Sequence, residues 1–303
     1  MASRLYQFVR AERTYNNQTR DAGGLVERSF VEDPAQRKRA RLSELVVTEL
    51  VDPPVALAAR RTTDVLTLGL HVAPAGVVIN PTTPSGRATW GSLGFLLRDA
   101  AARRLDIGTD EIQVGVHAVG AGDPTSVRGE VFIADTLQNG AGYAVWLADH
   151  LGEWFDGADT LAEDYRSHAT SEDQPCDSSC YRCLRDYSNR AWHPLLDWRL
   201  ATDLLDLIRG RPLVVEHDEE RVRRHVARFA ADFGLAATEV GGVAAVCAGQ
   251  RVMVVLHPFE DRGPESCAER VRRVRTVRPD VLLTTAFELV RRPGHVVGRL
   301  LSA

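Results

Sequence analysis

Three of the five cysteines in the chain lie within eight positions, at Cys176, Cys180 and Cys183. The C-x-x-C half of this cluster has the spacing that lets two thiolates reach one tetrahedral ion. The surrounding sequence, EDQPCDSSCYRC, is polar and turn-rich, whereas a free cysteine usually packs among apolar side chains. The cluster therefore predicts a metal site, and Zn²⁺ is the ion that suits it.

A closed site of this kind needs a fourth ligand, and the sequence offers four candidates: His168, His193, Cys247 and Cys267. His168 is preferred because it lies upstream in what we expect to be the same loop. Cys247 and Cys267 fall in expected core elements of the following region, and His193 precedes a proline that is expected to begin a helix. His193 stays open as an alternative. Four protein ligands leave no position for water, so the ion would be structural and not catalytic.

Other catalytic interpretations of the chain are weaker. Three clustered thiols exceed what a cysteine nucleophile with a histidine base requires. Asp135 follows an expected strand without a second carboxylate tied to it, so we predict that it caps a turn. Gly140 and Gly142 do not complete a dinucleotide fingerprint, because its third small residue would fall on Val145. They predict a tight turn before a helix.

Composition narrows the function classes. The 303 residues carry a formal net charge of −4, and Lys38 is the only lysine among the 37 lysines and arginines. A P-loop ATPase, a Schiff-base enzyme and a nuclease with a catalytic lysine are therefore disfavoured, and no recognisable catalytic set remains. No apolar run approaches the roughly 20 residues of a membrane helix, and no signal peptide is evident. We expect a cytoplasmic chain with no membrane contact, in which the clustered cysteines do not form disulfides.

The elements that position the cysteines alternate between strand and helix patterns. Leu66, Leu68, Leu70 and Val72 alternate as in a strand, and strands are also expected around 112–116 and 130–135, all three in one sheet. A helix is expected from a Ser92 cap onward, another from Tyr143 to Leu151, and a third from Pro194 to a stop at Gly210. Beyond Gly210 we expect a strand from 213, a helix, three strands, a helix and a strand.

These patterns predict a mixed α/β (α+β) fold in which a mixed sheet with helices carries a zinc-knuckle loop and a smaller C-terminal α/β domain follows. The expected boundaries are an N-terminal extension at 1–60, a zinc-binding domain at 61–210 and the C-terminal domain at 211–303. The order of elements in the C-terminal domain resembles the restriction-endonuclease-like core. Its strands VAAVCAG and RVMVVLHP carry no acid and no lysine, so a degenerate or unrelated module is expected.

The block CDSSCYRCLRDYSNRAWHPLLDWRLATDLL, with DTLQNGAGYAVWL upstream, resembles the MrfA-type zinc-binding domain at the C-terminal end of DEAD/DEAH-box helicases. It is most similar to the form in the DrmB family, the helicase-associated component of the DISARM anti-phage system. The resemblance covers about residues 60–210 and implies a zinc-stabilised accessory domain beside a helicase motor on DNA, in phage defence or repair. Relatives often carry four ligands in a tight run, whereas this chain has Gln174 and Pro175 just before the first cysteine. Relatives also tend to be longer, with a motor ahead of this region, so here the motor would be a separate polypeptide.

Arginines in the tail form three clusters, at 221, 223, 224 and 228, at 270, 272, 273, 275 and 278, and at 291 and 292. Two interpretations stay open: solvated helix faces balanced by Glu219, Glu220 and Glu269, or a DNA-backbone surface, because guanidinium groups suit phosphate contacts. The leading hypothesis is a non-catalytic zinc-binding accessory protein acting with a helicase on DNA. The alternatives are a metal-dependent nuclease with an unrecognised site in the C-terminal domain, and an assembly protein that does not contact nucleic acid.

Overall fold

The computed structural model describes the residues 9–11, 47–50, 62–70, 72–120, 127–169, 175–215 and 218–302. The chain divides into two compact units, Met1–Arg61 and Thr62–Ala303. In the first unit, Val9–Ala11 (β1) pairs antiparallel with Val47–Leu50 (β2). The interpretation of residues 1–60 as an extension lies otherwise outside the described residues. The predicted division of the second unit at residue 210 stays a prediction.

The second unit begins with an antiparallel sheet of three strands. Val65–Gly69 (β3) and Ile112–Gly120 (β4) both pair with the central strand, Val127–Asp135 (β5). A short 3₁₀ turn, Thr109–Glu111 (η2), leads into β4. Val131 and Ile133 of β5 are buried, as the alternating pattern requires. The prediction of three strands in one sheet is therefore confirmed.

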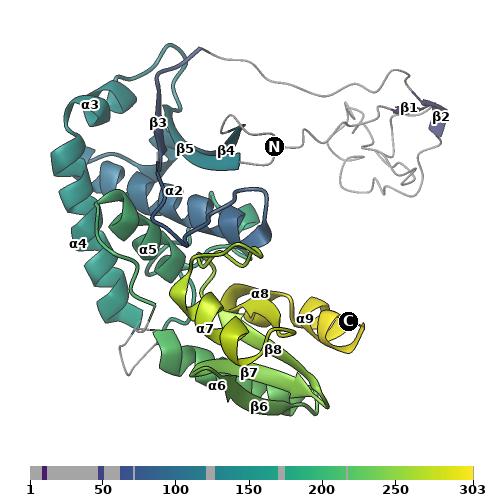
Figure 1. Cartoon of the computed structure of the whole chain (residues 1–303). Helices are drawn as coiled ribbons and strands as arrows, with labels where there is room; N and C mark the ends of the chain where they lie inside the picture. The colour runs from purple at the N-terminus through teal and green to yellow at the C-terminus, as the bar shows by residue number, and fades with distance from the viewer. Residues whose placement is uncertain are drawn as a thin grey trace. The chain divides into compact units, whose positions relative to one another are not determined.

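A long central helix, Pro84–Leu105 (α2), contacts β4 and β5 of this sheet and also two further helices (Figure 1). The predicted start at Ser92 is wrong by two turns, because Thr83 caps the helix and Pro84 occupies its first turn. Ser92 is buried in mid-helix, where its hydroxyl accepts a 2.9 Å hydrogen bond from the Asp197 backbone N–H. Neighbours on both sides bury most of α2, so it forms the middle of the core.

The two helices that cover α2 from the side away from the sheet are Leu151–Ala169 (α4) and Trp198–Ile208 (α5). The predicted helix around Tyr143 exists as Tyr143–Asp149 (α3), whereas α4 was not predicted. The predicted start of the third helix at Pro194 is wrong. Asp197 caps α5 by accepting the Arg199 backbone N–H, and only a 3₁₀ turn, Arg190–Trp192 (η3), precedes it.

A second sheet follows in the order β6-β7-β8-β9, formed by Ala236–Val240, Val243–Ala248, Arg251–Leu256 and Leu282–Thr285. The first three strands are antiparallel, and β9 joins β8 in parallel after the crossover helix Glu269–Val277 (α7). Helix Glu219–Asp232 (α6) precedes the sheet, and Ala286–Arg291 (α8) and Pro293–Ser302 (α9) close it. The predicted order from α6 to β9 is confirmed, α8 and α9 were not predicted, and residues 211–215 contain no strand.

The two sheets belong to one packed body. The Val78 backbone N–H donates to the Phe259 carbonyl at 2.8 Å, and the Asp261 N–H donates to the Gly76 carbonyl at 2.8 Å. Phe259 and Phe287, from the C-terminal region, are buried in the same apolar cluster as α2. The fold is thus the predicted mixed α+β class. No helix in the described part of the chain is long and apolar enough to cross a membrane.

Candidate metal centre

The three clustered cysteines and His168 lie together. The Sγ atom of Cys183 is 3.8 Å from the Sγ of Cys176 and 3.8 Å from the Sγ of Cys180. The His168 Nε2 atom lies 3.0 Å from the Cys180 Sγ, and ligand atoms of His168, Cys176 and Cys180 are all within 4.8 Å of one another. The imidazole thus gathers with the thiols of Cys176 and Cys180, and the Cys183 thiol lies next to both of these sulfurs.

The two sulfur–sulfur distances fit a tetrahedral zinc ion, whereas the 3.0 Å between the His168 Nε2 and the Cys180 Sγ is that of a hydrogen bond. With a Zn–S bond of about 2.3 Å, two thiolates on one tetrahedral ion stand about 3.8 Å apart. Both sulfur pairs that involve Cys183 have this separation. The donor set of three sulfurs and one ring nitrogen is a common set in structural zinc sites. The cluster is thus positioned to bind a metal ion, and its chemistry favours Zn²⁺.

His168 comes from a helix and not from the loop in which it was expected. It lies in the last turn of α4, which is fixed against α2 by Trp154, whose indole N–H donates to the Leu97 carbonyl at 2.9 Å. The His168 Nδ1 atom is buried and has no hydrogen-bond partner among the described residues. A buried polar atom without a partner is costly, by about 1–3 kcal/mol. The Nε2 atom is the one that faces the Cys180 thiol, so an ion bound there would not by itself give Nδ1 a partner.

The cysteines come from a loop, residues 175–197, which we call the zinc loop. Trp198, the first residue of α5, holds this loop twice. Its indole N–H donates to the Cys176 carbonyl at 3.1 Å, and its backbone N–H donates to the Ser178 carbonyl at 2.8 Å. Within the loop, the Cys180 N–H points at the Cys183 Sγ at 3.1 Å. Such N–H···S contacts stabilise negative charge on sulfur.

The thiols also show the electrostatics of a cation site. The hydrogen bond from Cys183 lowers the pKa of Cys176 to about 6. The same contact, together with burial, raises the pKa of Cys183. One thiol of the pair therefore ionises readily, and the second does so only when a positive charge compensates it.

The remaining candidates for the fourth ligand lie elsewhere. The His193 Nε2 atom faces two oxygens, the Asn189 Oδ1 at 2.9 Å and the Asp186 carbonyl at 3.0 Å, so it acts as a donor that braces the loop. Cys247 lies in β7, and Cys267 is exposed ahead of α7. Among the four candidates, the structure brings only His168 to the three cysteines.

Asp135 has the structural role that was predicted for it. Its buried carboxylate accepts the backbone N–H groups of Ala141, Tyr143 and Ala144 at 2.6, 3.1 and 2.9 Å. Gly140 and Gly142 take φ values of 80° and 83°, which suit the tight turn ahead of α3. This arrangement caps a helix, and both carboxylate oxygens are used by it.

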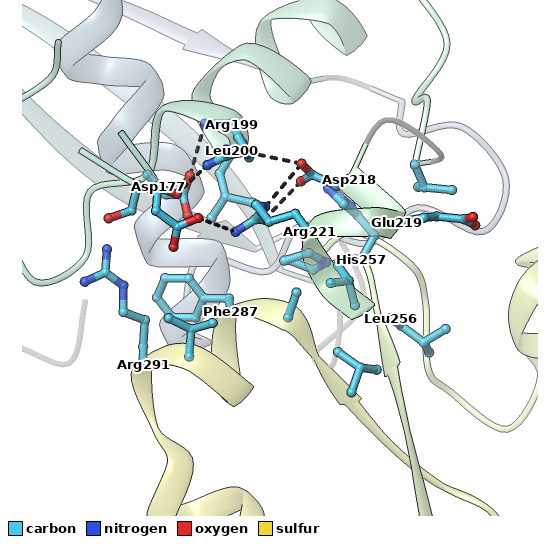
Figure 2. A pocket seen from close by; sticks show the side chains of 18 of the residues that line it. Asp177, Arg199, Leu200, Asp218, Glu219, Arg221, Leu256, His257, Phe287 and Arg291 are labelled. Atoms are coloured by element: carbon cyan, nitrogen blue, oxygen red, sulfur yellow. Dashed lines mark hydrogen bonds and ion pairs between the residues drawn. The ribbon is translucent and has the colours of Figure 1, made fainter. Parts of the chain in front are cut away.

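A network of acidic and basic side chains ties the zinc loop to the C-terminal region, and sequence reasoning missed it (Figure 2). Asp177, next to the first cysteine, lies 3.6 Å from Arg221 and 3.4 Å from His225 on α6. Arg199 of α5 and Arg221 both contact Asp218, at 3.2 and 3.0 Å. Except for Asp218 and Arg221, which are three residues apart, the partners are distant in the sequence, so no local pattern predicts these contacts.

The charges in this network are strongly coupled. A hydrogen bond from His225, with help from Arg221, holds the pKa of Asp177 well below its ordinary value. Burial opposes ionisation of Asp218, but Arg221 and Arg199 outweigh it, so the pKa of Asp218 is lowered. Asp197 is fully buried nearby, and burial raises its pKa to about 6.

Comparison with known proteins agrees with the metal centre. Residues 93–184 match the model of the MrfA Zn-binding domain. The matched segment runs from within α2 through β4, β5, α3 and α4 to the residue after Cys183, so it contains every part of the cluster. No curated protein and no solved structure matches the chain. The closer similarity to the DrmB family and to the restriction-endonuclease-like core stays a prediction.

Proposed function

We propose that this chain is a non-catalytic zinc-binding accessory protein that acts with a separate DEAD/DEAH-type helicase on DNA, in anti-phage defence of the DISARM type or in DNA repair. The observation that carries the proposal is the convergence of three cysteines and one histidine at the end of a segment that matches the MrfA Zn-binding domain. The protein lies in the cytoplasm in this proposal.

Cys176, Cys180, Cys183 and His168 are the proposed zinc ligands. The ion would supply a cross-link between the C-terminal end of α4 and the zinc loop, whose own interactions reach α5 and α6. With four protein ligands, none of its positions is open to a water or a substrate. Its contribution is therefore to the folding free energy of the domain.

The predicted DNA surface in the tail is smaller than the arginine count suggests. Arg221 is committed to the network with Asp218, and Arg223 pairs with Glu239 at 3.0 Å. Arg224 and Arg272 are exposed and have no ion-pair partner in the described part of the chain. In the proposal these guanidinium groups are available for phosphate contacts, and the zinc loop contributes further cations.

Metal analysis of the purified protein tests the ligand set. We expect one zinc per chain, which is lost in Cys180→Ser and in His168→Ala and kept in His193→Ala. Loss of zinc in His193→Ala but not in His168→Ala would overturn the choice of the fourth ligand. No zinc in the wild-type protein would overturn the proposal itself.

DNA assays separate the accessory protein from the alternatives. We expect salt-sensitive DNA binding without cleavage under Mg²⁺ or Mn²⁺. Metal-dependent nicking would support the nuclease, and no affinity at low salt would support a pure assembly protein. Capture of a DEAD/DEAH-type ATPase by the zinc-loaded chain, but not by Cys180→Ser, would support the helicase partnership.

A further inference from the structure

The zinc loop carries two exposed tyrosines, Tyr181 and Tyr187. The exposed fractions are 68% for Tyr181 and 74% for Tyr187, the latter equalled among large apolar or aromatic residues only by Val72 in the described part of the chain. Tyr181 lies between the second and third cysteine, and Tyr187 follows the third by four residues. Large rings on a loop surface gain little free energy from folding, since they are left in water. Their position calls for a binding partner.

The loop that carries these rings is held rigidly. His193 stands edge-on to the ring of Tyr181, with centroids 5.6 Å apart. Its Nε2 atom contacts the carbonyl of Asp186, the residue before Tyr187, and the side chain of Asn189. Asn189 is buried and also donates to the Leu184 carbonyl at 2.8 Å. These hydrogen bonds fix the backbone next to Tyr187, and the His193 ring packs against Tyr181, so that the rings are presented in advance of binding.

The charge around the rings is positive. The guanidinium of Arg190 lies 4.1 Å from the centroid of the Tyr187 ring, and Arg182 follows Tyr181 directly. Both arginines are exposed, and neither has an ion-pair partner among the described residues. The three acids of the loop face other elements, because Asp177 pairs with α6, Asp186 pairs with the buried Arg98 of α2, and Asp197 is buried as the N-cap of α5. The acids of the loop therefore do not neutralise Arg182 or Arg190.

Exposed rings with adjacent unpaired guanidinium groups match the chemistry of single-stranded nucleic acid. Unpaired bases stack on aromatic rings without regard to sequence, and arginines contact the intervening phosphates. A duplex hides its base faces, so it would use only the arginines. We propose that Tyr181 and Tyr187 stack bases of a single-stranded nucleic acid and that Arg182 and Arg190 bind its phosphates. This inference rests on the proposed function. It specifies a single strand as the ligand and the zinc loop as the surface that binds it.

The test measures binding of the zinc-loaded full chain to a labelled DNA single strand of about 12 nucleotides. An RNA of the same sequence and the matching DNA duplex are measured in parallel. Tyr187→Ala is expected to weaken single-strand binding by about 5- to 100-fold, and Tyr181→Ala by a similar factor, with much smaller effects on the duplex. Phe233→Ala, which removes a ring of 43% exposure at the end of α6, is the matched control and is expected to change nothing.

The arginine variants are expected to change a different quantity, the salt dependence of binding. Arg182→Ala and Arg190→Ala are each expected to lower the salt dependence of single-strand binding by about 0.7 in the slope of log K against log salt, as one lost phosphate contact would. Tyr187→Phe keeps the ring, and it should retain most of the affinity that Tyr187→Ala loses if stacking and not the hydroxyl is responsible.

Zinc content is measured for every variant, because Tyr181 adjoins a proposed ligand. If Tyr181→Ala loses its metal, its binding defect has two explanations. The test of base stacking then depends on Tyr187→Ala, which lies four residues beyond Cys183. Binding that Tyr187→Ala leaves unchanged would overturn this inference while the accessory function stands. No binding of any nucleic acid by the wild-type protein would overturn both. Equal affinity for DNA and RNA would show that the 2′-hydroxyl is not contacted, and preference for RNA would identify the strand as RNA.

Discussion

The zinc loop and the C-terminal sheet are fixed in place by different means. Residues 175–197 contain no strand and only the 3₁₀ turn η3, and they are held by specific hydrogen bonds, the charge network and the metal centre. The sheet β6–β9 has an apolar cluster on each face, one around Met253 and Val255 and the other around Val254 and Leu256. Successive side chains of β8 point to opposite faces of the sheet, so this one strand contributes to both clusters. The loop adds Leu184 and Leu196 to the main core, but most of its other side chains are not buried, so it depends on cross-links more than the sheet does.

The largest effect that this contrast predicts is on the loop. Cys180→Ser removes a proposed zinc ligand, and we expect loss of the ion and a decrease of about 4–5 kcal/mol in the free energy of unfolding. Urea unfolding with zinc analysis checks it. Cys267→Ser, at an exposed cysteine outside the cluster, is the control and should keep both zinc and stability. Equal behaviour of the two variants would show that the cluster does not hold the loop.

The next largest effect is on the sheet. Met253→Ala empties a site that is 0% exposed, and we expect a loss of about 3 kcal/mol from the lost burial and the cavity. Zinc content should stay at one per chain, because Met253 belongs to a different apolar cluster from the buried residues of the loop. If zinc is lost together with stability, the two regions are less independent than their interactions indicate.

A smaller effect tests the pH dependence where the two regions meet. Burial raises the pKa of Asp197 from its ordinary value of 3.8 to about 6, so the folded state binds this proton more tightly than the unfolded state does. Its contribution to stability is therefore present below about pH 4 and is lost as the pH rises through about 6. Asp197→Asn keeps an N-cap without the buried charge, and we expect it to be about 2 kcal/mol more stable than the wild-type protein at pH 7.

The check for Asp197→Asn is the difference between the two unfolding free energies from pH 4 to 7. The difference should be near zero at the acid end and grow through pH 6. Zinc release at low pH affects both proteins and cancels in the difference. A constant difference across the range would show that Asp197 does not titrate on unfolding.

The smallest effect concerns the coupling between the regions. Asp218→Asn weakens the contacts with Arg199 and Arg221, which are partly exposed to water, and we expect a loss of about 1 kcal/mol. Zinc should pass to a chelator faster, since the loop loses part of its attachment to α6. Arg228→Ala, which breaks an exposed pair with Asp232, is the control and should leave the release rate unchanged.

Much of this architecture could be predicted from local patterns. The alternation of apolar and polar residues predicted β3, β4 and β5, and apolar residues at helical spacing predicted α3 and α6. The cysteine spacing located the metal centre because ligands close in sequence leave a local signal. The capping role of Asp135 followed from its place at the end of a strand, where three backbone N–H groups now surround its carboxylate.

Features that depend on distant partners could not be predicted. Helix α4 has an amphipathic stripe, with Trp154, Leu161 and Tyr165 buried, and that signal was overlooked, so His168 was expected in a loop. Helix α2 is buried on nearly every side, so its first two turns show no apolar stripe to mark where it begins. The network from Asp177 to Asp218 joins residues about 40 positions apart, and only the folded chain brings them together.

One contact beneath the zinc loop bears on how this sequence can vary among homologues. A Cβ atom at Gly91 of α2 would lie 2.4 Å from the ring of Trp192, which is closer than real atoms approach. The indole thus occupies the space that a side chain on the helix would take. Homologues with alanine or a larger residue at the position of Gly91 should carry a smaller residue at the position of Trp192, and the two positions should change together during evolution.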